Sequence, residues 1–257
     1  MTTRFLRDTV TLTGRSLTHV LRSPDTIITT AVMPVAFLLL FVYVFGGAID
    51  TGSGVGRGNY VNYLLPGILL ITIASGIAYT AYRLFLDMQG GIFERFQSMP
   101  IARSAVLWAH VVTSVVSILV SLALVVGVAL IMGFRTDAGL LDWLAVVGIL
   151  LLFTFALTWL AVIPGLTAKS VDGASAFSYP LIFLPFISSA FVPTGSMPGP
   201  VRVFAEYQPV TSIVNTIRAL FEGEPVGSDI GVAMAWTVGL LVVAYAVSMV
   251  TYRRRIA

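Results

Sequence analysis

Long uncharged apolar runs alternate with short charged stretches along this chain. An α-helix needs about 20 residues to cross about 30 Å of hydrocarbon, and all but the fifth run reach that length. The pattern predicts an all-α integral membrane protein, with residues 1–257 forming a single transmembrane domain of six transmembrane helices. The six predicted spans are Thr26–Phe45, Tyr63–Leu86, Ser104–Met132, Trp143–Ile163, Ala174–Val192 and Ile230–Met249.

The fifth run is the least regular of the six. It is slightly short and contains Pro180 and Pro185. A proline inside a membrane helix frees backbone carbonyls, which neighbouring helices must then satisfy. We therefore expect kinks in residues 174–192.

The segment before the first span, residues 4–23, is amphipathic. Arg4, Arg15 and Arg22 fall on one helical face, with leucines such as Leu17 largely on another. This pattern is typical of a helix that lies in the headgroup layer. The alternative is a charged tail that follows the positive-inside rule without forming a helix. We predict an N-terminal amphipathic interfacial helix over 4–23.

The composition leaves little room for anything but a membrane domain. The chain is 57% hydrophobic and only 11% charged, against roughly 25% charged residues in a soluble domain. Its 257 residues leave no room for a separate soluble catalytic domain beside six spans. The absence of cysteine excludes disulfides and thiolate metal sites.

The positions of arginine and lysine predict the orientation. Cytoplasmic loops of membrane proteins carry an excess of these residues. If both termini are cytoplasmic, eleven arginines and lysines lie inside and four lie outside. The four outer residues are Arg57, Arg135, Arg202 and Arg218. We therefore expect both termini in the cytoplasm.

Residues 88–103 form the first segment with a mechanistic signature. Gly90 and Gly91 let the chain turn away from the second span, and residues 92–99 allow two helical turns before Pro100. Exposed aromatic side chains on such a helix suit docking into a groove of a partner protein. The alternative is that the phenylalanines lie against the membrane surface, and the residues alone do not decide between the two.

A second segment, residues 193–223, is expected on the outer side. It is rich in proline and then contains two stretches, 201–207 and 211–221, each too short to cross the bilayer. The second has an apolar face and ends at Gly223. Two such helices predict an outer re-entrant helical hairpin or an interfacial cap between spans five and six. An ordinary surface loop is the alternative, which the apolar face disfavours.

These two segments resemble a known family. The chain is similar to the type 2 ATP-binding-cassette exporter permeases, especially the daunorubicin-resistance-like membrane subunits, in motif order, spacing and six-span frame. Gln208-Pro209 departs from the Asn-Pro usual in that family. The matching residues are Gly91, Glu94, Arg95, Pro100 and Arg103 in the first segment, and Phe191, Pro193, Met197, Pro198, Pro209, Arg218 and Gly223 in the second.

The resemblance implies a complex of two membrane subunits and two ATPase subunits. The second membrane subunit is another copy of this permease or a paralogue. The segment 88–103 would be a coupling helix seated in the ATPase, where Phe93, Glu94, Arg95 and Phe96 transmit the ATP-driven motion, with the interfacial helix beside it. Such a permease resides in the bacterial plasma membrane among lipids and exports a lipophilic drug-like molecule or a lipid. No nucleic-acid partner is expected.

The chain carries no ATP-binding motif of its own. The phosphate loop has the pattern G-x-x-x-x-G-K-[ST], and Lys169, the only lysine, lacks the preceding glycine. We therefore expect a non-catalytic subunit without a cofactor, with Mg-ATP bound and hydrolysed on a partner chain.

Polar side chains recur at helical spacing inside two predicted spans. Such groups are costly in hydrocarbon unless they have partners, so they are candidates for a substrate pathway. The alternative is close helix packing, in which small hydroxyl residues are enriched. The pathway candidates are Thr72, Ser75 and Tyr79 in the second span and Ser114, Ser117 and Ser121 in the third.

The main rival function is an ion-coupled secondary transporter or a channel. Proton or sodium coupling usually needs a carboxylate near the membrane midplane. Asp87, Asp142, Asp172 and Asp229 all lie at or beyond the ends of the predicted spans. An intramembrane enzyme is disfavoured too, because the sequence lacks His-Glu-x-x-His and an intramembrane aspartate pair.

Overall fold

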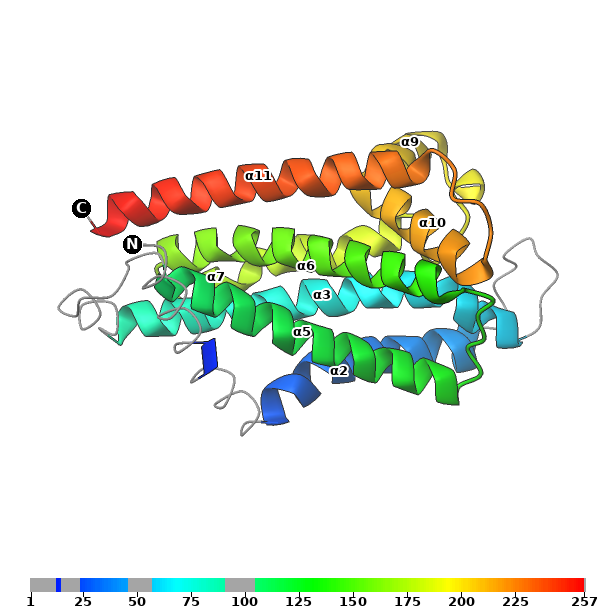
Figure 1. The fold of residues 1–257 in the computed structure, drawn as a ribbon, viewed down its shortest axis with the longest axis horizontal. Helices are drawn as coiled ribbons and strands as arrows, with labels where there is room; N and C mark the ends of the chain where they lie inside the picture. Colours follow the sequence, from blue (N-terminus) through cyan, green and yellow to red (C-terminus); the bar gives the residue numbers. More distant parts are fainter. Residues whose placement is uncertain (1–12, 15–23, 46–56, 91–104, 257) are drawn as a thin grey trace.

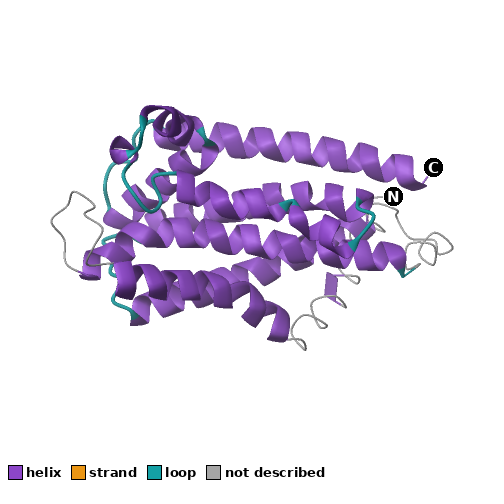
Figure 2. Ribbon diagram, turned by 180° about the vertical axis from the view of Figure 1, so that it is seen from behind, coloured by secondary structure: helices purple, strands orange, loops and turns teal. Residues whose placement is uncertain are grey.

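Helices make up all the regular secondary structure that the structure, a computed structural model, describes (Figures 1 and 2). It describes residues 13–14, 24–45, 57–90 and 105–256. Four helices in these ranges are long and apolar enough to cross a membrane. They are α3 (Arg57–Gln89), α5 (Ala105–Ile131), α6 (Leu140–Thr167) and α11 (Asp229–Ile256).

Two shorter apolar stretches accompany these four helices. The first is α2 (Pro24–Leu39), which continues as a π-helical turn, η1 (Leu40–Phe45). The second consists of α7 (Val171–Ala176), α8 (Ser178–Phe183) and the 3-10 turn η2 (Leu184–Ile187). Both overlap predicted spans, Thr26–Phe45 and Ala174–Val192, and the count of six membrane crossings stays a prediction. The predicted interfacial helix over 4–23 lies outside the described residues, apart from 13 and 14.

The second of these stretches is broken as its prolines predict. Ser170 caps α7 by accepting a hydrogen bond from the backbone amide of Gly173 at 3.1 Å. After Pro185 the Ser188 hydroxyl donates to the Pro185 carbonyl at 2.6 Å and accepts from the Ala190 amide at 3.1 Å. A side chain thus satisfies backbone groups that a regular helix would have paired.

Helix α3 lies at the centre of the bundle and α11 at its edge (Figure 1). In the most apolar stretch of α3, 83% of the residues are buried, whereas in the corresponding stretch of α11 only 17% are. α3 packs against α2, α5, α6, α7, α8 and α10, while α11 packs against α6 and α10. The core therefore forms around α3, and α11 leaves most of its surface uncovered.

Three short helical elements close one end of the bundle, which we call the α10 end. They are η3 (Thr194–Ser196), α9 (Gly199–Tyr207) and α10 (Pro209–Glu222). α10 ends at Gly223, whose φ of +67° allows the Glu224 amide to donate to the Ala219 carbonyl at 2.9 Å. The two short helices and the glycine stop were predicted from the sequence and are present.

Candidate functional site

The predicted coupling residues lie outside the described part of the chain. These are Gly91, Phe93, Glu94, Arg95, Phe96, Pro100 and Arg103. The helices on either side are described: α3 ends at Gln89 and α5 begins at Ala105. Near these ends His110 Nε2 lies 3.0 Å from Asp87 Oδ2. The segment 91–104 thus connects two helices that this side-chain contact joins.

Two of the polar residues proposed for a substrate pathway are buried and bonded within their own helices. The hydroxyl of Thr72 donates to the Ile68 carbonyl at 2.8 Å. The hydroxyl of Ser121 donates to the Ser117 carbonyl at 3.2 Å. Both side chains are fully buried, so they serve helix packing in this structure.

The other candidates come together only in part. Tyr79, Ser114 and Ser117 line a crevice between α2, α3 and α5, and Ser75 does not belong to it. Thr30, Thr80 and Arg83 also line it, and the Arg83 guanidinium lies 5.6 Å from the centre of the Tyr79 ring. The crevice measures about 10 Å³, which is close to the minimum that one water molecule needs.

Close packing explains why this crevice is so small. A Cβ atom added to Gly76 of α3 would lie 2.5 Å from Cγ1 of Ile118 on α5 and 3.5 Å from Cγ2 of Thr30 on α2. Glycine is therefore required where the three helices meet. In this conformation the polar faces of α3 and α5 are packed together around this crevice.

A buried cation organises the α10 end. Arg218 on α10 donates from Nη2 to the carbonyls of Ser189 at 2.8 Å and of Tyr63 at 3.1 Å. Its guanidinium carbon lies 3.9 Å from the centre of the Tyr63 ring, and the Tyr63 hydroxyl donates to the Ser189 carbonyl at 3.0 Å. One side chain thus joins α10, α3 and the segment after η2.

Asn215 extends this network to α11. Its side-chain oxygen accepts from the Ser189 hydroxyl at 2.6 Å and from Arg218 Nη1 at 3.3 Å. Its amide nitrogen donates to the Asp229 carboxylate at 3.0 Å. The sequence had identified Arg218 only through the family motif. Tyr63, Ser189, Asn215 and Asp229 carry no common sequence signal that would have grouped them with it.

Burial shifts the pKa values of two charged side chains at this end, Arg218 and Glu222. Burial lowers the pKa of the Arg218 guanidinium, and the nearby Tyr63 and Glu222 act in the opposite direction. Burial likewise raises the pKa of the Glu222 carboxyl, which Arg218 partly offsets. Because an arginine titrates far above neutral pH, Arg218 is a permanent buried cation held mainly by carbonyl dipoles.

Gln208, which stands where the family usually has asparagine, binds the chain before α10 with its side chain. It does not cap α10 with its side chain. Instead its amide nitrogen donates to the carbonyls of Leu184, at 3.2 Å, and of Ile187. Pro209 begins α10, where a missing amide hydrogen costs nothing. Pro193 flanks η3, and Met197 and Pro198 connect η3 to α9.

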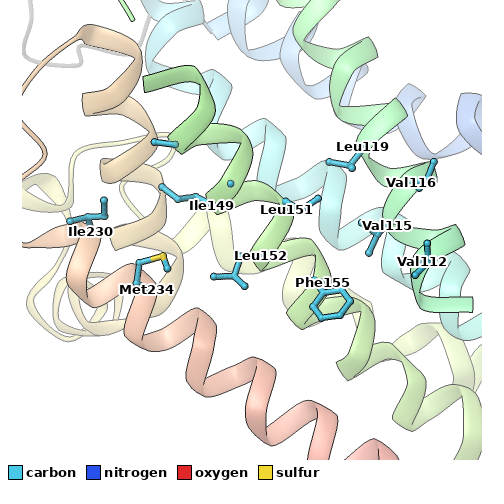
Figure 3. Close-up of a pocket in the computed structure, with 12 residues that line it drawn as sticks. Val112, Val115, Val116, Leu119, Ile149, Leu151, Leu152, Phe155, Ile230 and Met234 are labelled. Carbon is cyan, nitrogen blue, oxygen red and sulfur yellow. The ribbon is translucent and has the colours of Figure 1, made fainter. Parts of the chain in front are cut away.

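The sequence did not predict an apolar hollow, whose lining residues are shown in Figure 3. It lies between α5, α6 and α11 and measures about 760 Å³. Its lining consists of aliphatic residues with one phenylalanine and one methionine, for example Val116, Leu152, Phe155 and Met234. Elsewhere, no cluster of histidine, aspartate and glutamate among the described residues is suited to hold a metal ion.

Comparison with known proteins identifies the family. The family model described as "ABC-2 type transporter" matches residues 7–221. The chain belongs to this family. The match extends from before the first predicted span to Phe221 near the end of α10, so it includes the segment 88–103 and all but the last two residues of 193–223. As an ABC-2 permease, the chain is a multi-pass membrane protein, which agrees with its four long apolar helices.

Two bacterial relatives cover nearly the whole chain. The chain is 30% identical over 256 residues to the daunorubicin resistance ABC transporter permease protein DrrB1 of Streptomyces coeruleorubidus, covering 95% of this chain and 88% of the relative. It is 26% identical over 253 residues to the "Probable doxorubicin resistance ABC transporter permease protein DrrC" of Mycobacterium tuberculosis, covering 97% and 90%. This ABC-2 permease is therefore similar to drug-resistance permeases along nearly its full length.

Proposed function

We propose that this chain is the membrane-spanning subunit of an ATP-driven exporter that moves a lipophilic drug-like molecule or a lipid outward. The observation that carries the proposal is the full-length similarity to permeases named for daunorubicin and doxorubicin resistance. ATP-binding-cassette permeases of this kind work with separate ATPase subunits, which bind and hydrolyse Mg-ATP. The absence of a phosphate-loop sequence in this chain agrees with that division of labour.

The region around residues 88–103 supports a mechanism for coupling. In this proposal Phe93, Glu94, Arg95 and Phe96 dock into the ATPase subunit. The contact between the Asp87 and His110 side chains joins α3 and α5 beside this segment. A displacement of the segment would then move both helices as one unit. Since α3 is the central helix, the motion would reach most of the bundle.

The crevice between α2, α3 and α5 is a candidate entry to the substrate pathway. Tyr79, Ser114 and Ser117 give it a mildly polar lining inside otherwise apolar helices. Its volume of about 10 Å³ excludes a drug-sized molecule, which needs a pocket of roughly 300 Å³ or more. Transport through it therefore requires α2 to separate from α3 and α5.

An exposed apolar face offers a place for the second permease subunit. On α2 and η1, Met33 is 59% exposed and Tyr43 is 60% exposed, and on α8 Phe183 is 62% exposed. The rings of Phe37 on α2 and Phe186 on η2 pack edge to face at 5.6 Å. This contact makes α2 and the α8–η2 stretch one surface, which suits a second copy or a paralogue.

The α10 end would act as the outer lid of the pathway. We infer that α9 and α10 form the re-entrant hairpin predicted over 193–223, on the side opposite the coupling segment. Pro193, Met197, Pro198 and Pro209 set its turns. Arg218 fixes it to α3 and to the chain after η2. A rigidly held lid agrees with a pathway that is closed at this end in the present conformation.

An ion-coupled transporter is less well supported. Among the described residues, Asp87 is paired with His110 and Asp229 with Asn215, and both lie close to helix ends. Coupling to protons or sodium would need a carboxylate nearer the midplane.

The coupling assignment is tested with the complete complex of permease and ATPase subunits in lipid nanodiscs. We expect Glu94→Ala, and the double change Phe93→Ser with Phe96→Ser, to lower substrate-stimulated ATPase activity by roughly tenfold, which corresponds to about 1.4 kcal/mol of coupling. Glu206→Ala on exposed α9 is the matched control and should leave it unchanged. Wild-type transport by the segment variants would show that residues 88–103 do not couple.

A further inference from the structure

Aromatic rings from α5, α6 and α11 close one end of the hollow between these helices, and we call this cluster the aromatic floor. The ring of Trp108 on α5 lies 5.2 Å from that of Trp159 on α6, which lies 4.8 Å from that of Tyr245 on α11. Phe155 belongs to this cluster, 5.8 Å from Trp108, and also lines the hollow. The three helices are therefore joined through aromatic rings on the side away from α10.

Beyond this floor the three helices leave space between them. Within the described residues the backbones of α5 and α11 do not approach each other, and α6 packs against both. On α6 the residues that face the space include the small Ala145 and Gly148. A Cβ atom added to Gly148 would meet no atom within 4 Å. The hollow thus results from small residues on α6 and from the divergence of its two neighbours.

The length of the hollow matches one leaflet of a bilayer. On α6 the lining extends from Ala145 to Phe155, and ten residues of α-helix rise about 15 Å. Half of a hydrocarbon core of about 30 Å is also about 15 Å. On α11 the lining begins at Ile230, at the start of the helix, and on α5 it lies between Val112 and Leu119. Phe155 joins the hollow to the aromatic floor.

The apolar lining of the hollow favours a hydrocarbon chain as its occupant. None of the lining side chains carries a hydrogen-bonding or charged group. A drug-sized ligand normally needs a few placed polar partners to fix its orientation, whereas a hydrocarbon chain needs none. Leu151 is 43% exposed and Met234 is 39% exposed, so the hollow opens sideways to the surrounding lipid.

We propose that this hollow is a binding site for one acyl chain of a membrane lipid. The chain contacts α5, α6 and α11 together and ends on the aromatic floor. It supplies dispersion contacts to α11, whose backbone approaches only α6 and α10 among the described helices. The site requires only membrane-spanning helices, and its test is independent of drug export.

The test uses the chain in nanodiscs of phosphatidylethanolamine and phosphatidylglycerol, doped with a phosphatidylethanolamine whose acyl chain carries a mid-chain diazirine. After illumination, peptide mass spectrometry locates the label. We expect labelling of lining residues such as Leu152 and Met234 to exceed labelling of lipid-facing residues. Gly148→Leu fills the space and should lower it at least fivefold. Gly127→Leu is the matched control, because Gly127 also has no neighbour within 4 Å and does not line the hollow.

Three outcomes would overturn the proposal. Labelling that Gly148→Leu leaves unchanged would mean that the lipid only touches the outer surface. Displacement of the label by excess doxorubicin would make the hollow a drug site. A disulfide between two copies of Leu151→Cys, introduced into a chain that has no other cysteine, would mean that a second copy covers the hollow.

Discussion

Arg218 illustrates how a single residue can determine the architecture of one end of a membrane protein. A buried charge is expensive unless hydrogen bonds compensate it. Here the carbonyls of Tyr63 and Ser189, the Tyr63 ring and the Asn215 amide do so. The guanidinium suits this role because it donates in several directions within one plane.

Removal of this side chain should destabilise the fold. We expect Arg218→Ala to lower the free energy of unfolding by about 2–3 kcal/mol, because buried carbonyls lose their donors. The measurement is the thermal unfolding midpoint of the purified chain in detergent. Arg202 is the matched control: it is 52% exposed and pairs with Glu206 at 2.7 Å. Arg202→Ala should change the stability by less than about 0.5 kcal/mol, and equal effects of both variants would contradict a special role of Arg218.

At the scale of single residues, the sequence identified some important side chains but not the partners that they bind. Arg218 was identified because it matches a family motif, but its partner carbonyls lie 155 and 29 residues away in the chain. No local pattern links such positions. Gln208 shows the same limit, because its bonds to the η2 carbonyls depend on how α10 lies against η2.

Single elements were predicted better. The run Ser104–Met132 corresponds to α5 within one residue at each end. α6 and α11 extend several residues beyond the predicted 143–163 and 230–249. In α11 the polar residues up to Arg255 continue the helix past its apolar part, and in α6 the helix continues through Pro164. The prolines of residues 174–192 indicated a break without locating it. Its form depends on local hydroxyl bonds such as that of Ser188.

The packing of α3 depends on glycines that periodicity does not distinguish from other apolar residues. A Cβ atom at Gly67 would lie 2.5 Å from the Cβ of Ala190. We expect Gly67→Ala to destabilise the chain by about 1–3 kcal/mol, because neither backbone can withdraw easily. Gly127→Ala should be neutral or slightly stabilising, since alanine favours helix and has room there. Urea or thermal unfolding of both variants distinguishes these effects.

At the scale of the whole molecule, the distribution of charge predicts the orientation. The chain has no cysteine, so single cysteines introduced at exposed positions are unique reporters. In intact cells, Glu224→Cys near the α10 end should react with a membrane-impermeant maleimide. Arg254→Cys, at the opposite end of the bundle, should react only after lysis. The reverse result would invert the predicted topology.

The apolar hollow could not be predicted at this scale. Its lining residues have the same character as residues that face lipid or fill a core. Whether three apolar faces meet or leave space depends on crossing angles and on small residues such as Ala145 and Gly148. That information is absent from hydropathy, which is why the sequence directed attention to the polar positions of α3 and α5.

The Arg218 network also implies an order of assembly. A ribosome produces the chain from its N-terminus, so the Tyr63 carbonyl of α3 exists long before the arginine that will bind it. Until α10 is synthesised, this carbonyl and that of Ser189 lack their donor from Arg218. The nascent bundle can gather around α3, but its α10 end closes only when about five-sixths of the chain has been made. α11 then joins as the last helix, through its contacts with α6 and α10.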